Sequence, residues 1–209
     1  MRSPGSFSSD HTESVARYGQ RHVGMKITGG SRKGMNIEVV SGGARYTSSK
    51  VREAIFDYIG DISEGSVLDL FAGSASFSIE ALSRGAASCT AVEKDLLMAG
   101  MASKNLRNLG LDKSCLVLNM DVRYAVPFLA KKGEQYDLIF MDPPYEKGFV
   151  MEALGLLKKH PLHREGAWIV VEHSKREVPQ VGVECACRAE TRRYGDTMVT
   201  FFDVQPDPE

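Results

Sequence analysis

The sequence lacks any long uncharged apolar run, so no segment of it is expected to span a membrane. Cysteine is scarce: 209 residues contain only four, and the one close pair, Cys185 and Cys187, has no second Cys or His pair at metal-ligand spacing. We therefore expect no metal site and reduced thiols. The first twenty residues are rich in Ser and lack the apolar segment of a secretory signal. Together these absences favour a cytoplasmic protein.

Two nucleotide-binding fingerprints are also missing. There is no Gly-x-Gly-x-x-Gly of the nicotinamide-binding type, and no Gly-Lys-Ser/Thr completes a phosphate loop. The net charge of -1 gives no global signal for nucleic acid, but the charge is unevenly distributed. Residues 21–52 carry seven Lys and Arg against the single acid Glu38, and the rest of the chain is acidic. Such a basic segment suits a polyanion partner, although a solvated charged face would give the same pattern.

Strand and helix patterns alternate along most of the chain. The expected strands cover residues 66–71, 88–93, 115–119, 137–141 and 167–172. One expected helix follows the first strand and ends near residue 84, and three more cover 95–108, 122–131 and 149–158. Two consecutive strands, 181–190 and 197–204, close the chain. The pattern predicts an α/β, Rossmann-like fold: a seven-stranded, mostly parallel sheet with helices on both faces and an antiparallel C-terminal hairpin.

The N-terminal part follows a different pattern. Residues 25–40 are typical of a small β-hairpin joined through the glycine-rich stretch 29–34. A helix over about 51–59 follows, with Ser48 or Ser49 as N-cap and Gly60 at its end. We expect residues 1–24 to be a disordered extension or a segment added for expression, 25–46 to form the hairpin, and 47–209 to form the main domain.

Candidate ligand-binding residues follow three successive strands. In a sheet of this kind, ligands bind at the carboxyl ends of the strands. After the first strand, small residues let the backbone approach a ligand, and the next helix offers amide groups to a carboxylate. The candidates there are Asp69, Phe71, Ala72, Gly73 and Ser74.

The next two strands end in acidic residues. Glu93, followed by Lys94, ends the second strand, where a carboxylate can accept hydrogen bonds from both hydroxyls of a ribose. Asp121 follows the third strand and could accept a hydrogen bond from the amino group of an adenine. Alternatively, Glu93 and Asp121 only cap the helices that follow them.

The fourth strand runs directly into Asp142-Pro143-Pro144-Tyr145, which is the strongest signal in the sequence. The two prolines make the turn stiff and remove two backbone donors, so the turn presents acceptors. The Asp142 carboxylate and the Pro143 carbonyl can each accept one N–H of a base amine, and Tyr145 can stack on the base. Because the lone pair of an aromatic amine is delocalised, holding both N–H groups favours a pyramidal nitrogen able to attack a methyl donor.

Together these motifs resemble the RsmD family, bacterial 16S rRNA guanine-N2 methyltransferases with the class I S-adenosylmethionine-dependent fold. The resemblance covers about residues 25–204 and rests on residues 27–34, 45–47, 51–56, 67–74, 80–86, 142–145 and 194–197. The family usually has Pro at Tyr46, Asp at Ser49 and Gly at Ala75, so this chain departs from it there.

The resemblance implies S-adenosylmethionine as cofactor and a guanine in 16S rRNA of the small ribosomal subunit as substrate. It implies that residues 45–53, including Arg52, close over the methionine end of the cofactor, and that the hairpin contacts RNA. The base must be flipped out or already unstacked to be reached. The candidate phosphate-binding residues are Arg32, Lys33, Arg45, Lys50, Arg192 and Arg193.

Other functions fit part of this pattern. A DNA or RNA adenine-N6 or cytosine-N4 methyltransferase would share the Asp-Pro-Pro-Tyr motif, but DNA enzymes generally need a separate target-reading domain, and no insertion here is large enough. A non-catalytic RNA-binding assembly module would not need the acceptor pair, and a small-molecule amine or protein-glutamine substrate does not explain the basic segment. We expect the protein to act as a monomer.

Overall fold

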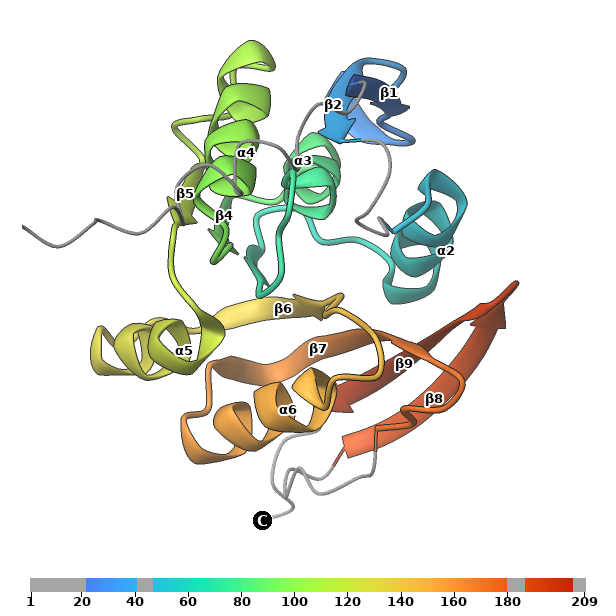
Figure 1. The fold of residues 1–209 in the computed structure, drawn as a ribbon, viewed down its shortest axis with the longest axis vertical. Coiled ribbons are helices and arrows are strands. Elements are labelled where there is room, and N and C mark those ends of the chain that lie inside the picture. The colour runs from blue at the N-terminus through green and yellow to red at the C-terminus, as the bar shows by residue number, and fades with distance from the viewer. Residues whose placement is uncertain (1–21, 41–46, 180–186, 205–209) are drawn as a thin grey trace, which may run out of the picture.

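The computed structural model describes residues 22–40, 47–179 and 187–204 (Figure 1). Its main element is a seven-stranded sheet with the strand order β5-β4-β3-β6-β7-β9-β8. Strands β3 to β7 run parallel, whereas β9 is antiparallel to both of its neighbours. The strands are β3 (Ser66–Asp69), β4 (Ser88–Val92), β5 (Cys115–Leu118), β6 (Tyr136–Met141), β7 (His163–Ser174), β8 (Cys187–Tyr194) and β9 (Thr197–Val204). The predicted fold class is confirmed.

Five α-helices in the described part of the chain cover the two faces of this sheet. They are α2 (Ser49–Ile59), α3 (Ser76–Ser83), α4 (Leu96–Asn108), α5 (Val122–Lys131) and α6 (Phe149–Lys159). One apolar cluster lies between the sheet and α2, α3 and α4, and a second lies between the sheet and α5 and α6 (Figure 1). In the first cluster, Phe77 stacks on Phe140 with ring centroids 3.7 Å apart and lies 4.9 Å from Phe56. Aromatic packing thus joins two of the helices to a central strand.

The order of the strands places a crevice at the centre of the sheet. β3 pairs with β4 on one side and with β6 on the other, so the strand order reverses at β3. The connections that leave β3 and β6 therefore diverge to opposite faces of the sheet and leave space between them. The segments after Asp69 and after Met141 flank this space.

The N-terminal hairpin consists of β1 (His22–Lys26) and β2 (Asn36–Val40), with a short 3-10 turn, η1 (Gly30–Arg32), between them. β1 begins at His22, before the expected boundary at residue 25. Three buried side chains of the hairpin, Ile27, Ile37 and Val39, belong to the same apolar cluster as side chains of α2 and α3. A two-stranded hairpin is marginal by itself, so this packing stabilises it.

Two glycines allow the hairpin to approach α3 closely. A Cβ atom on Gly29 would lie 2.5 Å from Cζ of Arg84, and one on Gly30 would collide with the backbone of Ser83. Gly30 also has φ +73°, which disfavours other residues. The glycine-rich stretch therefore serves this contact as well as the turn.

Candidate active site

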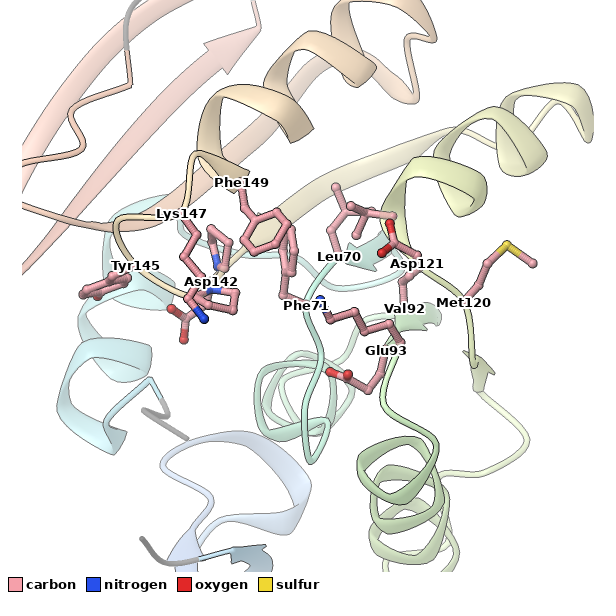
Figure 2. A pocket seen from close by; sticks show the side chains of 14 residues that line it. Leu70, Phe71, Val92, Glu93, Met120, Asp121, Asp142, Tyr145, Lys147 and Phe149 are labelled. Carbon is pink, nitrogen blue, oxygen red and sulfur yellow. The ribbon is translucent and has the colours of Figure 1, made fainter. Parts of the chain in front are cut away.

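A cavity of about 480 Å³ lies at the carboxyl ends of the central strands (Figure 2). The segments that line it follow β3, β4, β5 and β6, as expected for a switch in strand order. All four residues of the Asp142-Pro143-Pro144-Tyr145 motif line it. Four of the residues predicted to bind the cofactor line it too: Phe71, Glu93, Lys94 and Asp121. The structure thus brings the predicted catalytic motif and four of the nine residues predicted to bind the cofactor into one space.

Glu93 fixes the loop after β3. Its Oε2 accepts a hydrogen bond from the backbone N–H of Gly73 at 2.9 Å, and its Oε1 accepts one from the N–H of Asp95 at 2.8 Å. The N-cap of α4 is Asp95, so Glu93 does not cap that helix. Because each carboxylate oxygen can accept more than one hydrogen bond, Glu93 keeps capacity for hydroxyl groups of a ligand.

Asp121 both caps a helix and lines the cavity. Its carboxylate accepts from the N–H of Arg123 at the start of α5, which is the capping role considered as an alternative. The Arg123 guanidinium also donates to both oxygens at 2.8 Å and lowers the pKa of Asp121 to about 2. Asp121 is therefore ionised at neutral pH and contributes a fixed negative charge to the cavity.

Lys94 and two aromatic rings line another part of the cavity. The Lys94 ammonium lies 5.1 Å from the centroid of the Phe149 ring, within the range of a cation–π contact. The Phe71 and Phe149 rings are tilted, with centroids 6.3 Å apart (Figure 2). These rings give the cavity an apolar surface beside its carboxylates.

The predicted catalytic motif is held at both ends. The Asp142 Oδ2 accepts a hydrogen bond from Thr47 Oγ1 at 2.8 Å. The Tyr145 hydroxyl donates to Glu172 Oε1 at 3.1 Å, on β7. Beyond the motif, Glu177 accepts from the N–H groups of Glu146 and Gly148 at 2.8 and 3.0 Å. Contacts with neighbouring strands and loops therefore restrain the stiff Pro-Pro turn.

Several residues predicted to bind the cofactor do not line this cavity. Ala72, Gly73 and Ser74 are absent from the lining, although the Gly73 N–H donates to the lining side chain of Glu93. The Asp69 side chain is buried and accepts from Ser78 Oγ at 2.8 Å. Burial raises the pKa of Asp69 to about 7, the negative charge of Glu93 adds to this effect, and the Ser78 hydrogen bond opposes it.

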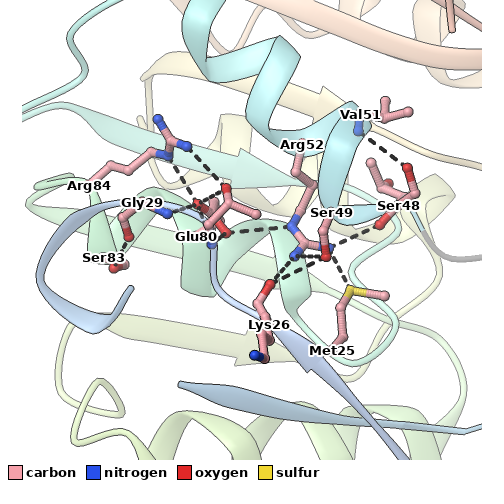
Figure 3. A network of polar contacts seen from close by, with 12 residues as sticks. Met25, Lys26, Gly29, Ser48, Ser49, Val51, Arg52, Glu80, Ser83 and Arg84 are labelled. Carbon is pink, nitrogen blue, oxygen red and sulfur yellow. Dashed lines mark hydrogen bonds and ion pairs between the residues drawn. The ribbon is translucent and has the colours of Figure 1, made fainter. Parts of the chain in front are cut away.

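Arg52 lies elsewhere, in a polar network between the hairpin, α2 and α3 (Figure 3). Its side chain is fully buried and makes an ion pair of 3.6 Å with the equally buried Glu80. Glu80 also accepts from the N–H groups of Thr28 and Gly29 and from Arg84 Nε. Arg52 is not among the residues that line the cavity, and its two Nη atoms donate to the backbone carbonyls of Thr47 and Lys26.

The predicted RNA-contacting residues have different surroundings. Lys33 is exposed in the hairpin, and Lys50 is exposed at the start of α2. The Arg32 side chain donates to the Leu109 carbonyl at 3.1 Å. Arg192 pairs with Glu190 at 2.7 Å and lies 4.1 Å from the Tyr58 ring centroid, and Arg193 donates to the Gly195 carbonyl. Arg45 lies outside the described residues. Among the candidates, Lys33 and Lys50 are the two whose side chains form no hydrogen bond or ion pair with other described residues.

Sequence reasoning missed several residues of the site. Lys147 and Phe149 line the cavity just after the motif, and Met120 and Val122 line it on either side of Asp121. Their proximity to predicted residues was the available signal. Thr47 was predicted only as part of the segment 45–53, and no sequence signal indicated its contact with Asp142, 95 positions away.

Comparisons with known proteins agree with this geometry. A family model described as Conserved hypothetical protein 95 matches residues 25–203. Ribosomal RNA small subunit methyltransferase D of Escherichia coli (strain K12) is 36% identical over 150 residues, which cover 71% of this chain and 74% of that protein. The chain belongs to the RsmD family. YlbH of Bacillus subtilis (strain 168) is 37% identical over 182 residues, covering 85% of this chain and 98% of YlbH.

A solved structure with lower sequence identity has the same fold. The T. thermophilus 16S rRNA N2 G1207 methyltransferase RsmC, in complex with AdoMet and guanosine, matches with a TM-score of 0.68 at 20% identity. The match covers 88% of this chain and 50% of that chain. At this identity the likeness shows the fold alone. Across the described ranges, no group of three or more His, Cys, Asp or Glu side chains is arranged to hold a metal ion, and no helix is long and apolar enough to cross a membrane.

Proposed function

We propose that this RsmD-family chain transfers the methyl group of S-adenosylmethionine to the exocyclic N2 amine of a guanine in 16S rRNA of the small ribosomal subunit. One observation carries the proposal: the whole Asp142-Pro143-Pro144-Tyr145 motif lines the same cavity as the carboxylates that follow β4 and β5. The family relative in E. coli is a small-subunit rRNA methyltransferase, and RsmC, which shares the fold, is named for N2 methylation of a guanine.

The charges of the cavity fit the proposed cofactor. S-adenosylmethionine carries a sulfonium, an ammonium and a carboxylate, so it is a cation overall. Three carboxylates, Glu93, Asp121 and Asp142, line the cavity together with two lysines, Lys94 and Lys147. In such a cofactor complex Glu93 would accept hydrogen bonds from ribose hydroxyls and Asp121 from the adenine amine. When bound, the cofactor supplies an electrophilic methyl group.

The motif would act on the guanine by accepting and orienting. The Asp142 carboxylate and the Pro143 carbonyl each accept one N–H of the amine, and the nitrogen lone pair is then directed at the methyl group. Tyr145 stacks on the base and contributes about 1–3 kcal/mol, while Glu172 holds its hydroxyl. Methyl transfer would leave the amine cationic, and Asp142 or water would accept the proton that the amine then loses.

Exposed basic residues would hold the RNA. Lys33 and Lys50 are exposed, and Lys147 lines the cavity beside the motif. Ammonium groups near the target base would contact its flanking phosphates, because phosphate contacts position the nucleic acid. The base itself must leave its stack to enter the cavity. We also propose that the protein works as a monomer in the cytoplasm.

Small subunits that lack the modification provide the test. They and genomic DNA are incubated separately with the protein and labelled S-adenosylmethionine, and the modified nucleotide is mapped by mass spectrometry. The proposal expects label in one guanine of 16S rRNA. Label found only in DNA, or in an adenine or cytosine, would refute it in favour of another amino-methyltransferase.

The Asp142→Ala variant tests the mechanism and the non-catalytic alternative together. We expect this variant to lose methyl transfer while its RNA affinity changes little, because the carboxylate acts on the amine rather than on the phosphates. Asp112→Ala, at an exposed turn after α4, is the matched control and should retain full activity. Unchanged turnover in Asp142→Ala would contradict the mechanism.

A further inference from the structure

Thr47 contacts the proposed catalytic carboxylate from outside the cavity. Its side chain is 3% exposed, it is absent from the cavity lining, and its Oγ1 lies 2.8 Å from Asp142 Oδ2. Since Thr carries the proton, its hydroxyl donates and the carboxylate accepts. A hydrogen bond to a carboxylate is stronger than one between neutral groups. Thr47 is therefore well placed to influence Asp142 without touching the substrate.

The backbone of Thr47 is itself held in place. The Arg52 guanidinium donates to the Thr47 carbonyl from Nη1 at 3.0 Å and to the Lys26 carbonyl from Nη2 at 2.9 Å. Ser48, the next residue, caps α2 by accepting from the N–H of Val51 (Figure 3). The buried ion pair of Arg52 with Glu80 anchors the guanidinium in turn. Thr47 thus has little freedom to move away from Asp142.

We propose that Thr47 is a positioning residue whose hydroxyl fixes the rotation of the Asp142 carboxylate. The terminal torsion of an aspartate is broad, so a carboxylate without such a contact rotates easily. An acceptor that is already oriented needs no reorganisation when the amine arrives, and this lowers the barrier. A carboxylate has about four acceptor positions, so Thr47 does not use up its capacity. The inference rests on the proposed function, because it assigns Asp142 to the amine.

The geometry also explains why a residue so far along the chain is required. The Pro-Pro turn fixes the backbone of Asp142 but not its side chain. Arg52 ties the segment before α2 to the hairpin and to α3, and so helps to hold it at the end of β6. The polar network that contains Arg52 therefore supports the site indirectly, which gives a structural role to a residue first predicted to bind the cofactor.

Two substitutions separate the hydroxyl from the shape of the side chain. Thr47→Val keeps the shape and removes the donor, whereas Thr47→Ser keeps the donor. For Thr47→Val we expect kcat to fall about 10- to 100-fold, the range for a hydrogen bond to a charged group. The KM for the unmodified subunits and the Kd for S-adenosylmethionine should change by less than about 3-fold. Thr47→Ser should recover most of the lost kcat.

Thr90→Val is the matched control. Thr90 is also a buried threonine, and it accepts a hydrogen bond from the Tyr136 hydroxyl at 3.0 Å, away from the cavity lining. Loss of the Thr90 hydroxyl should lower the midpoint of thermal unfolding and leave kcat unchanged. Thr47→Ala replaces Thr47→Val in the comparison if the valine variant does not fold.

The outcomes distinguish this inference from the function on which it rests. Wild-type transfer with an unchanged kcat in Thr47→Val would overturn the inference alone. Thr47→Ser as slow as Thr47→Val would also overturn it, since packing rather than the hydroxyl would then matter. Absence of transfer by the wild-type protein would overturn the proposed function and this inference with it.

Discussion

Replacement of Asp69 by Asn should change how stability depends on pH. Asp69 ends β3, its side chain is 1% exposed, and its Oδ2 accepts a hydrogen bond from Ser78. Its Oδ1 is buried without a hydrogen-bond partner among the described residues. An asparagine has nearly the same shape and its amide oxygen can accept from Ser78, but it cannot ionise. The substitution therefore removes one buried titration with little other change.

The magnitude follows from the pKa of Asp69. Burial, with a contribution from the charge of Glu93, raises this pKa from 3.8 to about 7. Between those two values the folded protein keeps a proton that the unfolded chain has lost, so stability falls as the pH rises. One pKa unit corresponds to about 1.4 kcal/mol, so ionisation of Asp69 costs the wild type about 4 kcal/mol once the pH exceeds about 7. Asp69→Asn avoids this cost.

Urea unfolding of both proteins from about pH 4 to about pH 8 measures this effect. The stability of Asp69→Asn relative to the wild type should rise across this window by about 4 kcal/mol and become constant above about pH 7. All other titrating groups are common to the two proteins and cancel in the difference. A difference that is flat with pH, or that favours the wild type at high pH, would refute the assignment of a raised pKa to this carboxyl.

Two further substitutions test the polar network and the substrate side of the cavity. Glu80→Gln leaves the fully buried Arg52 without its counter-charge and should destabilise the protein by about 3–5 kcal/mol in chemical unfolding. The control Glu38→Gln, which breaks an exposed pair with Lys104, should cost less than about 1 kcal/mol, and equal effects would contradict the buried role. Lys147→Gln should lower RNA affinity and reduce the slope of log affinity against log salt by about 0.7–0.9, as expected for one lost phosphate contact. An unchanged slope in filter binding would show that Lys147 does not contact phosphate.

The fold was largely predictable because buried parallel strands are short apolar runs between helices. The expected helix over 122–131 coincides with α5, and Ser48 is the N-cap of α2, which was one of the two candidates. The end of the chain was less predictable. β8 extends to Tyr194, beyond the expected end at residue 190, because pairing with β9 continues through polar residues. The part of this expected strand before Cys187 lies outside the described residues.

The site was predictable where it depends on the ends of strands. Glu93, Asp121 and the motif at residues 142–145 meet because parallel strands end at one edge of the sheet. Side-chain direction was not predictable: Asp69 faces Ser78 on α3, and Arg52 faces Glu80. These contacts depend on how helices pack on the sheet, which no local pattern encodes.

Ala75 shows how a departure from a family pattern can be understood only in three dimensions. It stands where the family usually has glycine, and it adopts φ +63° and ψ +30° at the N-cap of α3. Left-handed conformations cost residues with a Cβ atom about 1–2 kcal/mol, which glycine avoids. The family pattern thus reflects backbone geometry at this turn, and this chain carries the strain instead.

The attachment of the hairpin has a consequence for the proposed RNA contact at its outer surface. Glu80 is bound by backbone N–H groups of the hairpin as well as by side chains, so exposed positions such as Lys33 can vary without weakening the attachment. New target preferences could therefore be grafted onto the outer surface of the hairpin while its inner surface stays unchanged. A graft that replaced Gly30 would instead push the hairpin away from α3 and admit water to Glu80 and Arg52.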